Sequence, residues 1–407
     1  MDFKYYIRKT ADVRLKDVLA VFPMLLAFVL TPLFRKKYST TWAVCERKDE
    51  ARDNGFHFFK YVRREHPEQP CIYAIDRNCR DYLKIRDLGQ TVQFGSIKHW
   101  ILYFSSEYLI SSQAFHPNNY VATLIERAGL FRPSHVFLQH GITINRASFL
   151  LPSHRTVKYF VAGAKPEFEY MRDTFGYPEG TMQYTGFARF DSLHSFNVLK
   201  NRVLVMPTWR KWLTQKSEEH QGLTNDIATS EYYICWSSFL KSERLSKLIE
   251  KENLEIVFYP HPNFRQFLDI STMVDQRIRI ADPEKEDLQE LLKSSSLLVT
   301  DYSSVFFDMV YMKKPVLFFQ FDEEKYRKYH YKKGWFDYHT SPFGICCDNT
   351  DSLVKALKKE IESGFSVSQE YLQEHDRVFE LFDDENCKRI YEMLKETDIS
   401  KKNLERQ

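Results

Sequence analysis

The stretch Leu297-Leu-Val-Thr-Asp-Tyr-Ser-Ser-Val-Phe-Phe-Asp308 decides the fold class that this sequence indicates. Its apolar start, from Leu297 to Val299, predicts a buried parallel strand. The strand ends at Thr300, and Ser303 and Ser304 then begin a predicted helix. A helix start has unpaired backbone N–H groups and the positive end of the helix dipole, so the stretch is typical of a phosphate site. A simpler interpretation is equally open, in which Ser303 only caps the helix.

Strands alternate with helices along the rest of the chain, which predicts parallel sheets. The predicted strands are 41–45, 71–75, 108–111, 135–138, 159–161 and 183–186, then 202–205, 255–259, 278–281, 297–299, 315–319 and 344–346. The predicted helices include 52–66, 120–128, 231–250, 285–293, 303–312 and 351–363. Two such runs predict an α/β protein with two Rossmann-like, doubly wound domains facing each other across a cleft. We expect these domains to cover residues 38–195 and 196–365, followed by C-terminal helices in 366–407.

The composition narrows the class of protein. The chain has 407 residues, of which 43% are hydrophobic, enough for two ordinary cores. Its 58 basic and 55 acidic residues nearly balance, so no nucleic-acid partner is expected. The seven cysteines are odd in number and include no C-x-x-C pair, which favours reduced thiols over disulfides or a zinc site.

The N-terminal segment differs from the rest of the chain. Residues 18–34 are uncharged, and basic residues stand on both sides, including Arg35, Lys36 and Lys37. As a helix the run would reach about 26 Å, short of the ~30 Å hydrocarbon core of a bilayer. A membrane-surface helix, a spanning helix and a buried core helix all remain open. The basic flanks favour lipid headgroups, so we expect residues 1–37 to associate with a membrane surface.

Polar residues follow four of the predicted strands at the point where each strand ends. They are Gln139-His140-Gly141, Thr208-Trp209-Arg210, Pro260-His261-Pro262 and Asp301-Tyr302-Ser303-Ser304. A single histidine after a strand is more often structural than catalytic. Ligands of open α/β sheets bind beyond the carboxyl ends of the strands, however, and four such ends would meet in one cleft.

In these motifs the chain resembles the CDP-glycerol glycerophosphotransferases, which build teichoic acids and related bacterial polymers. The resemblance covers residues 40–350. It rests on the order and spacing of Trp42–Glu46 with Asp53-Asn54-Gly55, Gln139-His140-Gly141, Gly186–Asp191, Pro207–Arg210, Pro260-His261-Pro262, Thr300–Ser304, Asp308, Lys314-Pro315 and Asp322. Many members carry Thr-Pro and then a lysine after the His-Gly pair, whereas this chain has Ile142-Thr143-Ile144-Asn145-Arg146. Ala188 stands where a proline is usual.

The resemblance implies the GT-B fold and a transferase that moves glycerol phosphate from CDP-glycerol to an acceptor hydroxyl, releasing CMP. It places the protein peripherally at the cytoplasmic face of the cell membrane. The chain is similar in length to the primase type, whose acceptor is a lipid-linked saccharide on undecaprenyl diphosphate. A polyol-phosphate polymerase and a transferase that uses CDP-ribitol remain alternatives. A GT-B glycosyltransferase that uses a nucleotide-sugar is a more distant one.

The expected chemistry gives each motif a role. His140 is the natural general base for the acceptor hydroxyl, since its ordinary pKa is near neutral. His261 would hydrogen-bond the diphosphate or protonate the leaving phosphate. Arg210 offers a guanidinium fork for phosphate oxygens. Ser303 and Ser304 would cradle the diphosphate.

The remaining candidates are assigned by their place in these motifs. The substrate-binding set also includes Gly141, Ile142, Thr143, Arg189, Thr208, Pro260, Asp301 and Asp308. Asp301 is expected to orient its turn rather than act as a base. Glu46, Asp53 and Asn54 are candidates for the acceptor side, and a capped helix start explains them equally well. No paired carboxylates suggest a metal ion, and we expect neither a metal nor another cofactor.

Overall fold

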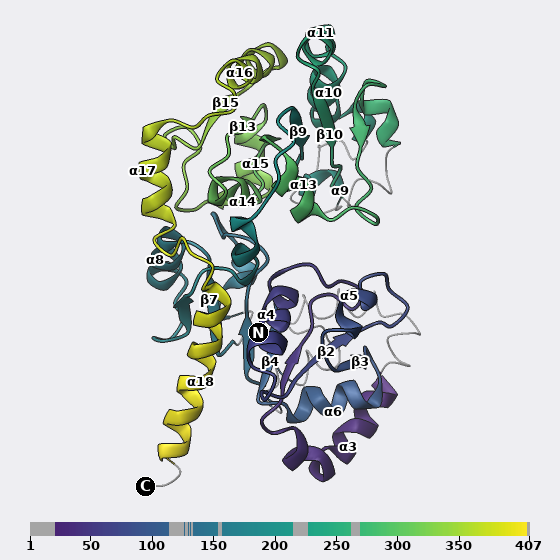
Figure 1. Cartoon of the computed structure of the whole chain (residues 1–407), viewed down its shortest axis with the longest axis vertical. Helices are drawn as coiled ribbons and strands as arrows, with labels where there is room; N and C mark the ends of the chain where they lie inside the picture. Colours follow the sequence, from purple (N-terminus) through teal and green to yellow (C-terminus); the bar gives the residue numbers. More distant parts are fainter. Residues whose placement is uncertain are drawn as a thin grey trace.

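The computed structural model describes residues 21–113, 126, 129, 131, 133–153, 157–214, 227–261 and 269–404, with side chains described up to residue 396. Two parallel sheets organise the chain into a first and a second half (Figure 1). The first sheet has the order β3-β2-β1-β4-β5-β7-β8 and the second β11-β10-β9-β12-β13-β15. The predicted α/β fold with parallel sheets is therefore confirmed.

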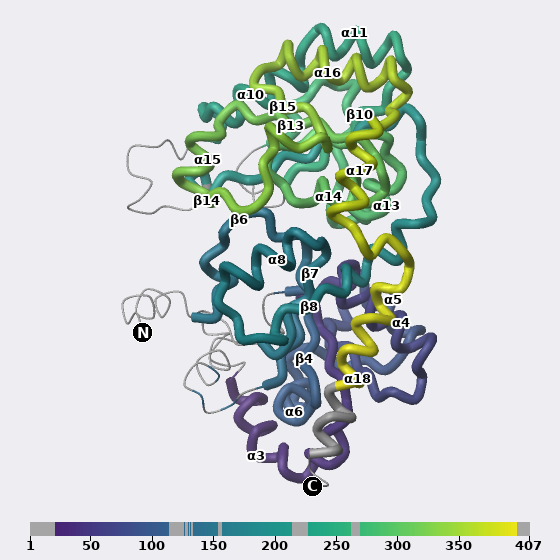
Figure 2. Tube along the Cα trace, turned by 90° about the vertical axis from the view of Figure 1, so that its left-hand side faces the viewer, coloured from purple at the N-terminus to yellow at the C-terminus, as the bar shows by residue number. Residues whose placement is uncertain are grey.

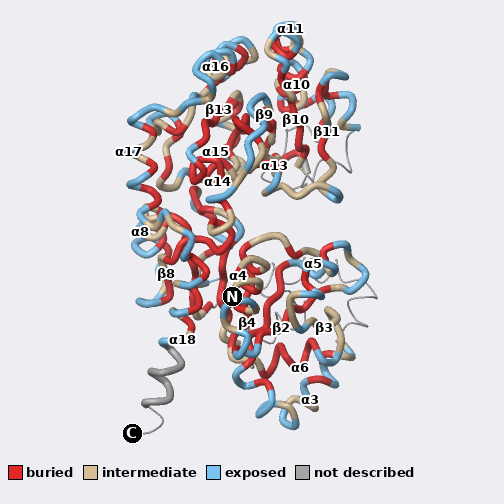
Figure 3. Tube along the Cα trace, viewed as in Figure 1, coloured by how far each residue is buried: buried red, intermediate tan, exposed pale blue. Residues whose placement is uncertain are grey.

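The strands are short and closely match the sequence pattern. The first sheet contains β1 (Trp42–Val44), β2 (Cys71–Ile75), β3 (Thr91–Gln93), β4 (Tyr108–Ser111), β5 (His135–Phe137), β7 (Tyr159–Ala162) and β8 (Met182–Tyr184). The second contains β9 (Arg202–Val205), β10 (Glu255–Phe258), β11 (Arg279–Ile280), β12 (Leu297–Thr300), β13 (Val316–Phe319) and β15 (Gly344–Cys347). Every residue of the central strands β1, β4 and β12 is buried, as expected when both faces of a parallel sheet are covered (Figure 3).

Helices connect and cover the strands. They are α3 (Val21–Tyr38), α4 (Asn54–Glu65), α5 (Tyr82–Arg86), α6 (Ile97–Ser105), α8 (Lys165–Thr174), α9 (Lys211–Thr214), α10 (Glu231–Leu240), α11 (Glu243–Glu252), α13 (Leu288–Ser294), α14 (Phe306–Tyr311), α15 (Glu323–Tyr329), α16 (Thr350–Glu362), α17 (Gln369–Val378) and α18 (Asn386–Leu404). The chain returns from the second half through α17 and α18, and α18 packs on α4 of the first half (Figure 1). The C-terminal helices therefore fasten the two halves together.

Several predicted boundaries are wrong. Residues 231–250 form two helices, because Ser242 caps α11 by accepting a hydrogen bond from the Leu245 N–H. The helix expected at Ser303 begins only at Phe306. The strand predicted at 183–186 ends at Tyr184, since Gly186 turns the chain with a φ of 75°. Strand β3 was not predicted. Most of the predicted helix 120–128 lies outside the described residues.

Helix α3 lies against α6 at the end of the first half that is farthest from the second sheet (Figure 1). One side of it is buried through Met24 and Ala27, while Phe22, Val29 and Leu33 are each more than 70% exposed. Within the described part of the chain, no helix has the length and hydrophobicity needed to cross a bilayer. In its described part, from Val21 onward, the segment combines a core-facing side with an exposed apolar side.

Both sheets reverse their strand order at one point. The reversal lies between β1 and β4 in the first sheet and between β9 and β12 in the second. Such switch points leave a crevice beyond the carboxyl ends of the strands, where ligands bind in open α/β folds. The segments after β9, β10 and β12 carry Thr208, His261 and Ser303-Ser304. The topology thus brings the polar strand ends of the second half to one edge.

Candidate active site

A cavity of about 350 Å³ lies between the two halves. The predicted site residues that line it are His140, Gly141, Ile142, Thr143, Arg189, Thr208, His261, Ser303 and Ser304. Other lining residues were not predicted, among them Gln139, Trp209, Tyr302, Tyr326, His330 and Tyr331. The structure therefore brings together predicted site residues that are up to 164 positions apart in the sequence, from both halves.

The loop that carries His140 is held in an unusual conformation. Gln139, directly before it, has a φ of 60°, a left-handed value that a non-glycine residue adopts only when its surroundings enforce it. The side-chain amide of Gln139 donates to the Val161 carbonyl at 2.6 Å and accepts from the Thr143 hydroxyl at 2.9 Å. These bonds turn the chain so that His140 itself is exposed at the cavity.

Glu167 lies beneath this loop and is completely buried. Its carboxylate accepts hydrogen bonds from the backbone N–H of Thr143 at 2.5 Å, the backbone N–H of Gly163 at 2.7 Å and the Gln139 amide at 3.1 Å. Burial raises the pKa of Glu167 to about 7, although these hydrogen bonds lower it. Glu167 thus fixes the shape of the His140 loop. No pattern in the sequence marked it, because it stands near the start of an ordinary surface helix.

The opposite wall carries the two serines. An added Cβ at Gly141 would lie 3.0 Å from the Ser304 hydroxyl oxygen, so the two halves approach each other closely at this point. The backbone N–H groups of Phe306, Phe307 and Asp308 bond to the carbonyls of the preceding turn. Within the described residues, the backbone N–H groups of Ser303 and Ser304 have no partner. The backbone donors that face the cavity therefore lie in the serine turn itself and not at the start of α14, where the sequence predicted them.

His261 stands on the same wall at the end of β10. Its ring lies 6.1 Å from that of Trp209, and Trp209 in turn contacts His330 at 4.9 Å between ring centroids. Burial, and secondarily the charge of Arg47, lowers the pKa of His261 to about 4. His261 is therefore neutral at pH 7 in the unliganded protein.

Arg210 does not line the cavity, and the phosphate-binding role expected for it is wrong. Its side chain is fully buried and forms a two-pronged pair with Asp322 at 2.8 and 3.0 Å. It also contacts Asp301 at 2.9 Å and donates to the Thr208 carbonyl. Asp301 accepts from the backbone N–H groups of Thr208 and Tyr302, as expected for a residue that orients its turn. The buried guanidinium of Arg210 therefore connects the segments that follow the strands and is not accessible to a ligand in the cavity.

Arg189 is the arginine that reaches the cavity. Its guanidinium forms a two-pronged pair with Asp308 at 2.9 and 2.7 Å and contacts Asp53 at 3.2 Å. Asp308 belongs to the second half and Asp53 to the first. Asp308 is therefore neither solvated nor a wall of the cavity, since its carboxylate is committed to Arg189.

The three acceptor-side candidates lie outside the cavity, Asp53 and Asn54 at the start of α4 and Glu46 in the loop before it. The buried carboxylate of Glu46 accepts from the backbone N–H groups of Arg52, Asp53 and Phe56, and burial raises its pKa to about 8. Asp53 caps the helix. Asn54 donates to the Gln139 carbonyl at 2.7 Å and accepts from the backbone N–H of Arg189 at 3.0 Å. The capped-helix interpretation is the one that the structure supports. Pro260 is also absent from the cavity wall.

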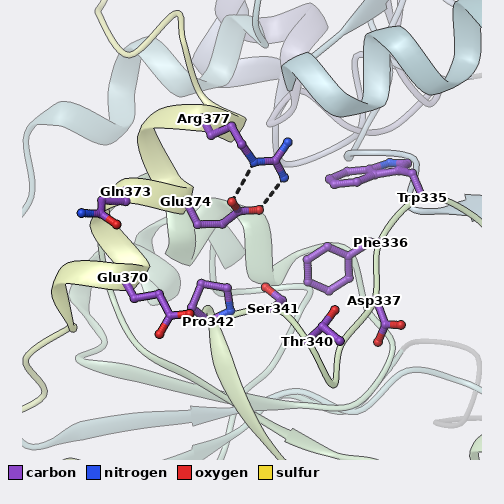
Figure 4. Close-up of a pocket in the computed structure, with 10 residues that line it drawn as sticks. All are labelled: Trp335, Phe336, Asp337, Thr340, Ser341, Pro342, Glu370, Gln373, Glu374 and Arg377. Carbon is purple, nitrogen blue, oxygen red and sulfur yellow. Dashed lines mark hydrogen bonds and ion pairs between the residues drawn. The ribbon is translucent and has the colours of Figure 1, made fainter.

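A second cavity of about 440 Å³ lies between α17 and the loop 335–342 (Figure 4). Its one arginine, Arg377, is paired through both prongs with Glu374, and Asp337 and Glu370 add further negative charge. It contains none of the residues singled out by the sequence. An acidic groove of this kind repels phosphate, so we place the site in the first cavity.

A cavity between the carboxyl edges of two parallel sheets is typical of nucleotide-binding α/β proteins. The family model for CDP-Glycerol:Poly(glycerophosphate) glycerophosphotransferase matches residues 26–396. The chain therefore belongs to this family, as its motifs predicted.

Individual relatives agree with this assignment. The chain is 30% identical, over 91% of its length, to the minor teichoic acid biosynthesis protein GgaB of Bacillus subtilis. It is 24% identical, over 74% of its length, to the teichoic acid ribitol-phosphate polymerase TarK of Staphylococcus aureus. It spans 41% of the first relative and 58% of the second. The solved structure of the wall teichoic acid polymerase TagF superposes with a TM-score of 0.63 at 17% identity, covering 96% of this chain and 99% of that one, and so shares the fold.

Proposed function

We propose that this chain transfers glycerol phosphate from CDP-glycerol to a hydroxyl group of an acceptor and releases CMP. The observation that carries the proposal is the cavity itself, in which His140 and the pair Ser303-Ser304 stand on opposite walls. Family membership supplies the reaction class. The two halves then correspond to an acceptor side, residues 38–195, and a donor side, residues 196–365, of a GT-B enzyme.

In the proposed reaction the acceptor oxygen attacks the β-phosphorus of CDP-glycerol. The bond from that phosphorus to the bridging oxygen breaks, and CMP leaves with both electrons. His140 takes the proton of the attacking hydroxyl as general base. Transfer of this kind depends chiefly on positioning and charge stabilisation, which the rigid loop held by Gln139 and Glu167 supports.

The donor diphosphate is proposed to bind the serine turn. The hydroxyls and backbone N–H groups of Ser303 and Ser304 offer several donors in one place. The Thr208 hydroxyl adds another, since within the described residues it has no hydrogen-bond partner. His261, neutral at pH 7, would donate a hydrogen bond to the diphosphate rather than a full proton. Arg189 also lines the cavity, although Asp308 and Asp53 already balance its charge.

The test is incubation of the purified protein with CDP-glycerol, CDP-ribitol or UDP-sugars and defined acceptors, with products scored by mass. We expect CMP release with a CDP-polyol and its loss in His140→Ala. The matched control is His339→Ala, an exposed histidine outside the cavity. Release of UDP from a nucleotide-sugar, or full activity of His140→Ala, would refute the proposal.

The primase role is our first candidate for the acceptor step, with a lipid-linked saccharide as acceptor. A polymerase is the second candidate. It is supported by the extent of similarity, since the similarity to the poly(glycerol phosphate) polymerase of Bacillus subtilis covers 74% of this chain and that to the glycerol-phosphate primase of the same organism covers 29%. Product mass separates the two roles. A primase adds one unit to the disaccharide, whereas a polymerase produces a ladder.

We also propose that the protein binds the membrane surface through α3. This helix exposes Phe22, Val29 and Leu33 and ends with the basic residues Arg35, Lys36 and Lys37. Apolar insertion together with attraction to anionic lipid is the usual mode of surface helices. Val29→Glu/Leu33→Glu should leave the protein in solution when it is sedimented with phosphatidylglycerol vesicles. Ile234→Glu, an exposed apolar residue on α10, is the control, and equal sedimentation of both variants would reject the membrane role.

A further inference from the structure

Thr143, three residues after His140, uses all of its polar groups to fix the loop that carries this histidine. Its backbone N–H donates to Glu167 at 2.5 Å, and its hydroxyl donates to the side-chain oxygen of Gln139 at 2.9 Å. Both of these partners belong to the first half. The carbonyl is the third polar group of Thr143, and its partner comes from the other half of the molecule.

The Thr143 carbonyl accepts a hydrogen bond from the indole N–H of Trp335 at 2.9 Å. Trp335 belongs to the second half and stands 192 positions further along the chain. Thr143 lines the cavity together with His140, whereas Trp335 does not. Any effect of Trp335 on a substrate in this cavity therefore passes through the residues that it contacts.

The ring of Trp335 packs on a different element, the helix that follows the serine turn. Its centroid lies 5.8 Å from that of Phe307, a fully buried residue of α14. The backbone N–H of Phe307 donates to the Ser304 carbonyl at 3.1 Å, so Phe307 is bonded directly to the serine turn. Trp335 thus contacts the His140 loop through its N–H and the support of the serine turn through its ring.

Trp335 is held in this place by a two-stranded ribbon that joins the halves. Strand β6 (Asn145–Arg146) of the first half pairs antiparallel with β14 (Lys332–Lys333) of the second, which ends two residues before Trp335 (Figure 2). An added Cβ at Gly334 would overlap the Ile144 carbonyl, so a larger residue would push the chains apart at this point. Backbone pairing between the halves therefore brings the indole to its acceptor.

We propose that Trp335 is a positioning residue for the general base His140. The proposal rests on the proposed function, because it assigns Trp335 a part in that same reaction. While the ribbon joins the halves, the indole N–H fixes the carbonyl of Thr143, and Glu167 fixes the N–H of the same residue. Without the indole bond the loop loses its support from the second half, and His140 no longer faces the donor phosphate in one fixed direction. Because the same indole packs on Phe307, the place of the base is coupled to that of the serine turn.

The first experiment removes the indole N–H and keeps an aromatic ring. In Trp335→Phe a ring remains beside Phe307, whereas the Thr143 carbonyl loses its donor. With CDP-glycerol and whichever acceptor the wild type uses, a polyprenyl-diphosphate disaccharide or a glycerol phosphate hexamer, kcat for CMP release should fall about tenfold. The KM for CDP-glycerol should stay within about twofold, because the serine turn keeps its support. An unchanged kcat, or a loss expressed only in this KM, would overturn the proposal.

The matched control is Trp236→Phe, the same change at a buried tryptophan of the second half. Within the described residues the indole N–H of Trp236 has no hydrogen-bond partner, and its ring packs against Phe319. Neither residue lines the cavity. At a temperature at which circular dichroism shows both variants to be folded, the control should keep the kcat and KM of the wild type. A similar fall of kcat in the control would mean that the lost indole bond is not the cause, and would overturn the proposal.

A second variant separates the two contacts of Trp335. Trp335→Ala removes the ring as well as the N–H, so Phe307 also loses its neighbour. We expect kcat to fall as in Trp335→Phe and, in addition, the KM for CDP-glycerol to rise at least about threefold. Equal kcat and equal KM in the two variants would show that the ring does not support the serine turn, and would refute the coupling.

The placement of His140 is also tested without catalysis. In protein labelled at its histidine rings, Trp335→Phe should broaden or split the NMR signals of His140, because the released loop exchanges between orientations. The signals of His66, which stacks on Tyr391 at the end of α4, should stay unchanged. His140 signals as sharp as in the wild type would overturn the proposal. If the wild type releases no CMP from any CDP-polyol, the proposed function fails, while broadened His140 signals still support the positioning role.

Discussion

The regions around Arg210 and Arg189 use the same chemistry for different purposes. Each guanidinium holds two aspartates, one of them through both prongs. The partners of Arg210, Asp301 and Asp322, both belong to the second half. The partners of Arg189, Asp53 and Asp308, come from different halves.

The two clusters differ in which parts of the molecule they hold together. Arg210 is completely buried and lies about 5 Å from the rings of Tyr232 and Tyr302, so its cluster is a dry brace inside one half. Arg189 lines the cavity and connects both halves to each other. The role of a buried arginine–carboxylate cluster therefore depends on whether its carboxylates belong to one half or to both. The sequence motif that contains the arginine does not reveal this.

The largest expected effect is the loss of protein stability when Arg210 is replaced. Arg210→Met leaves the buried carboxylates of Asp301 and Asp322 without their cation, which should lower the free energy of unfolding by about 3–5 kcal/mol. Urea denaturation followed by tryptophan fluorescence measures this. Arg172→Met removes an exposed arginine paired with Asp173 and should cost less than about 1 kcal/mol. Similar losses in both variants would contradict the brace.

The next effect is on catalysis at Arg189. Arg189→Lys keeps the charge but loses the fork that holds Asp308 and Asp53 together, so the halves should lose their relative placement. We expect kcat/KM for CMP release to fall by about 10²-fold, the usual result of a small misplacement of reacting groups.

The control for this variant is Arg52→Lys. Arg52 also joins the halves, pairing with Asp81 and donating to the Pro283 carbonyl, but it does not line the cavity. An equal loss in both variants would mean that any contact between the halves serves as well as Arg189.

The two arginines also mark what the sequence could and could not reveal. The strands were predicted well because buried parallel strands are short apolar runs, and His140, His261, Ser303 and Ser304 were found because they follow those runs. The role of Arg210 was not foreseeable, since Asp322 stands 112 residues away and only the fold brings the two together. The same holds for Glu46 and Asn54, whose partners are backbone groups that no side-chain motif records.

Glu167 is the opposite case, a residue important for the site that the sequence did not single out. It acts on the His140 loop through backbone N–H groups at Thr143 and Gly163, and a helix-start carboxylate in the sequence looks like many others. The sequence singled out Ser303 and Ser304 as the start of a helix, but the helix begins only at Phe306 and the two serines form a turn before it. Local patterns thus predict elements and strand-end chemistry, whereas contacts between distant strands decide which residues remain available to a ligand.

A smaller effect is the pH dependence of stability that His261, in the same half as Arg210, should cause. Because burial lowers the pKa of His261 to about 4, the unfolded chain takes up this proton near pH 6.5 and the folded protein only near pH 4. The stabilising contribution is therefore complete above pH 6.5 and is lost as the pH falls toward 4. In His261→Asn this part of the acid destabilisation should be absent.

The histidine ring signals in NMR measure the same property directly. His261 should titrate near pH 4 in the free protein and at a higher pH when CMP is bound, because a nearby phosphate favours the charged ring. His339, exposed and away from the cavity, provides the reference signal. A His261 midpoint that does not move with CMP would place the phosphate elsewhere.

The smallest effect tests how closely the halves approach at the cavity. The Cβ of Gly141→Ala would lie 3.0 Å from the Ser304 hydroxyl, a contact that a shift of a few tenths of an ångström relieves. Stability should change by less than about 1 kcal/mol, as is usual for substitutions that need only slight adjustment. The KM for CDP-glycerol should rise, because the serine turn must move away from the diphosphate. In Gly141→Ala/Ser304→Gly the crowding is gone and only the lost hydroxyl remains, so the effects of the two changes should not add. Simple additivity would mean that the halves stand further apart in solution, and that Arg189, not the contact of Gly141 with Ser304, sets the width of the cavity.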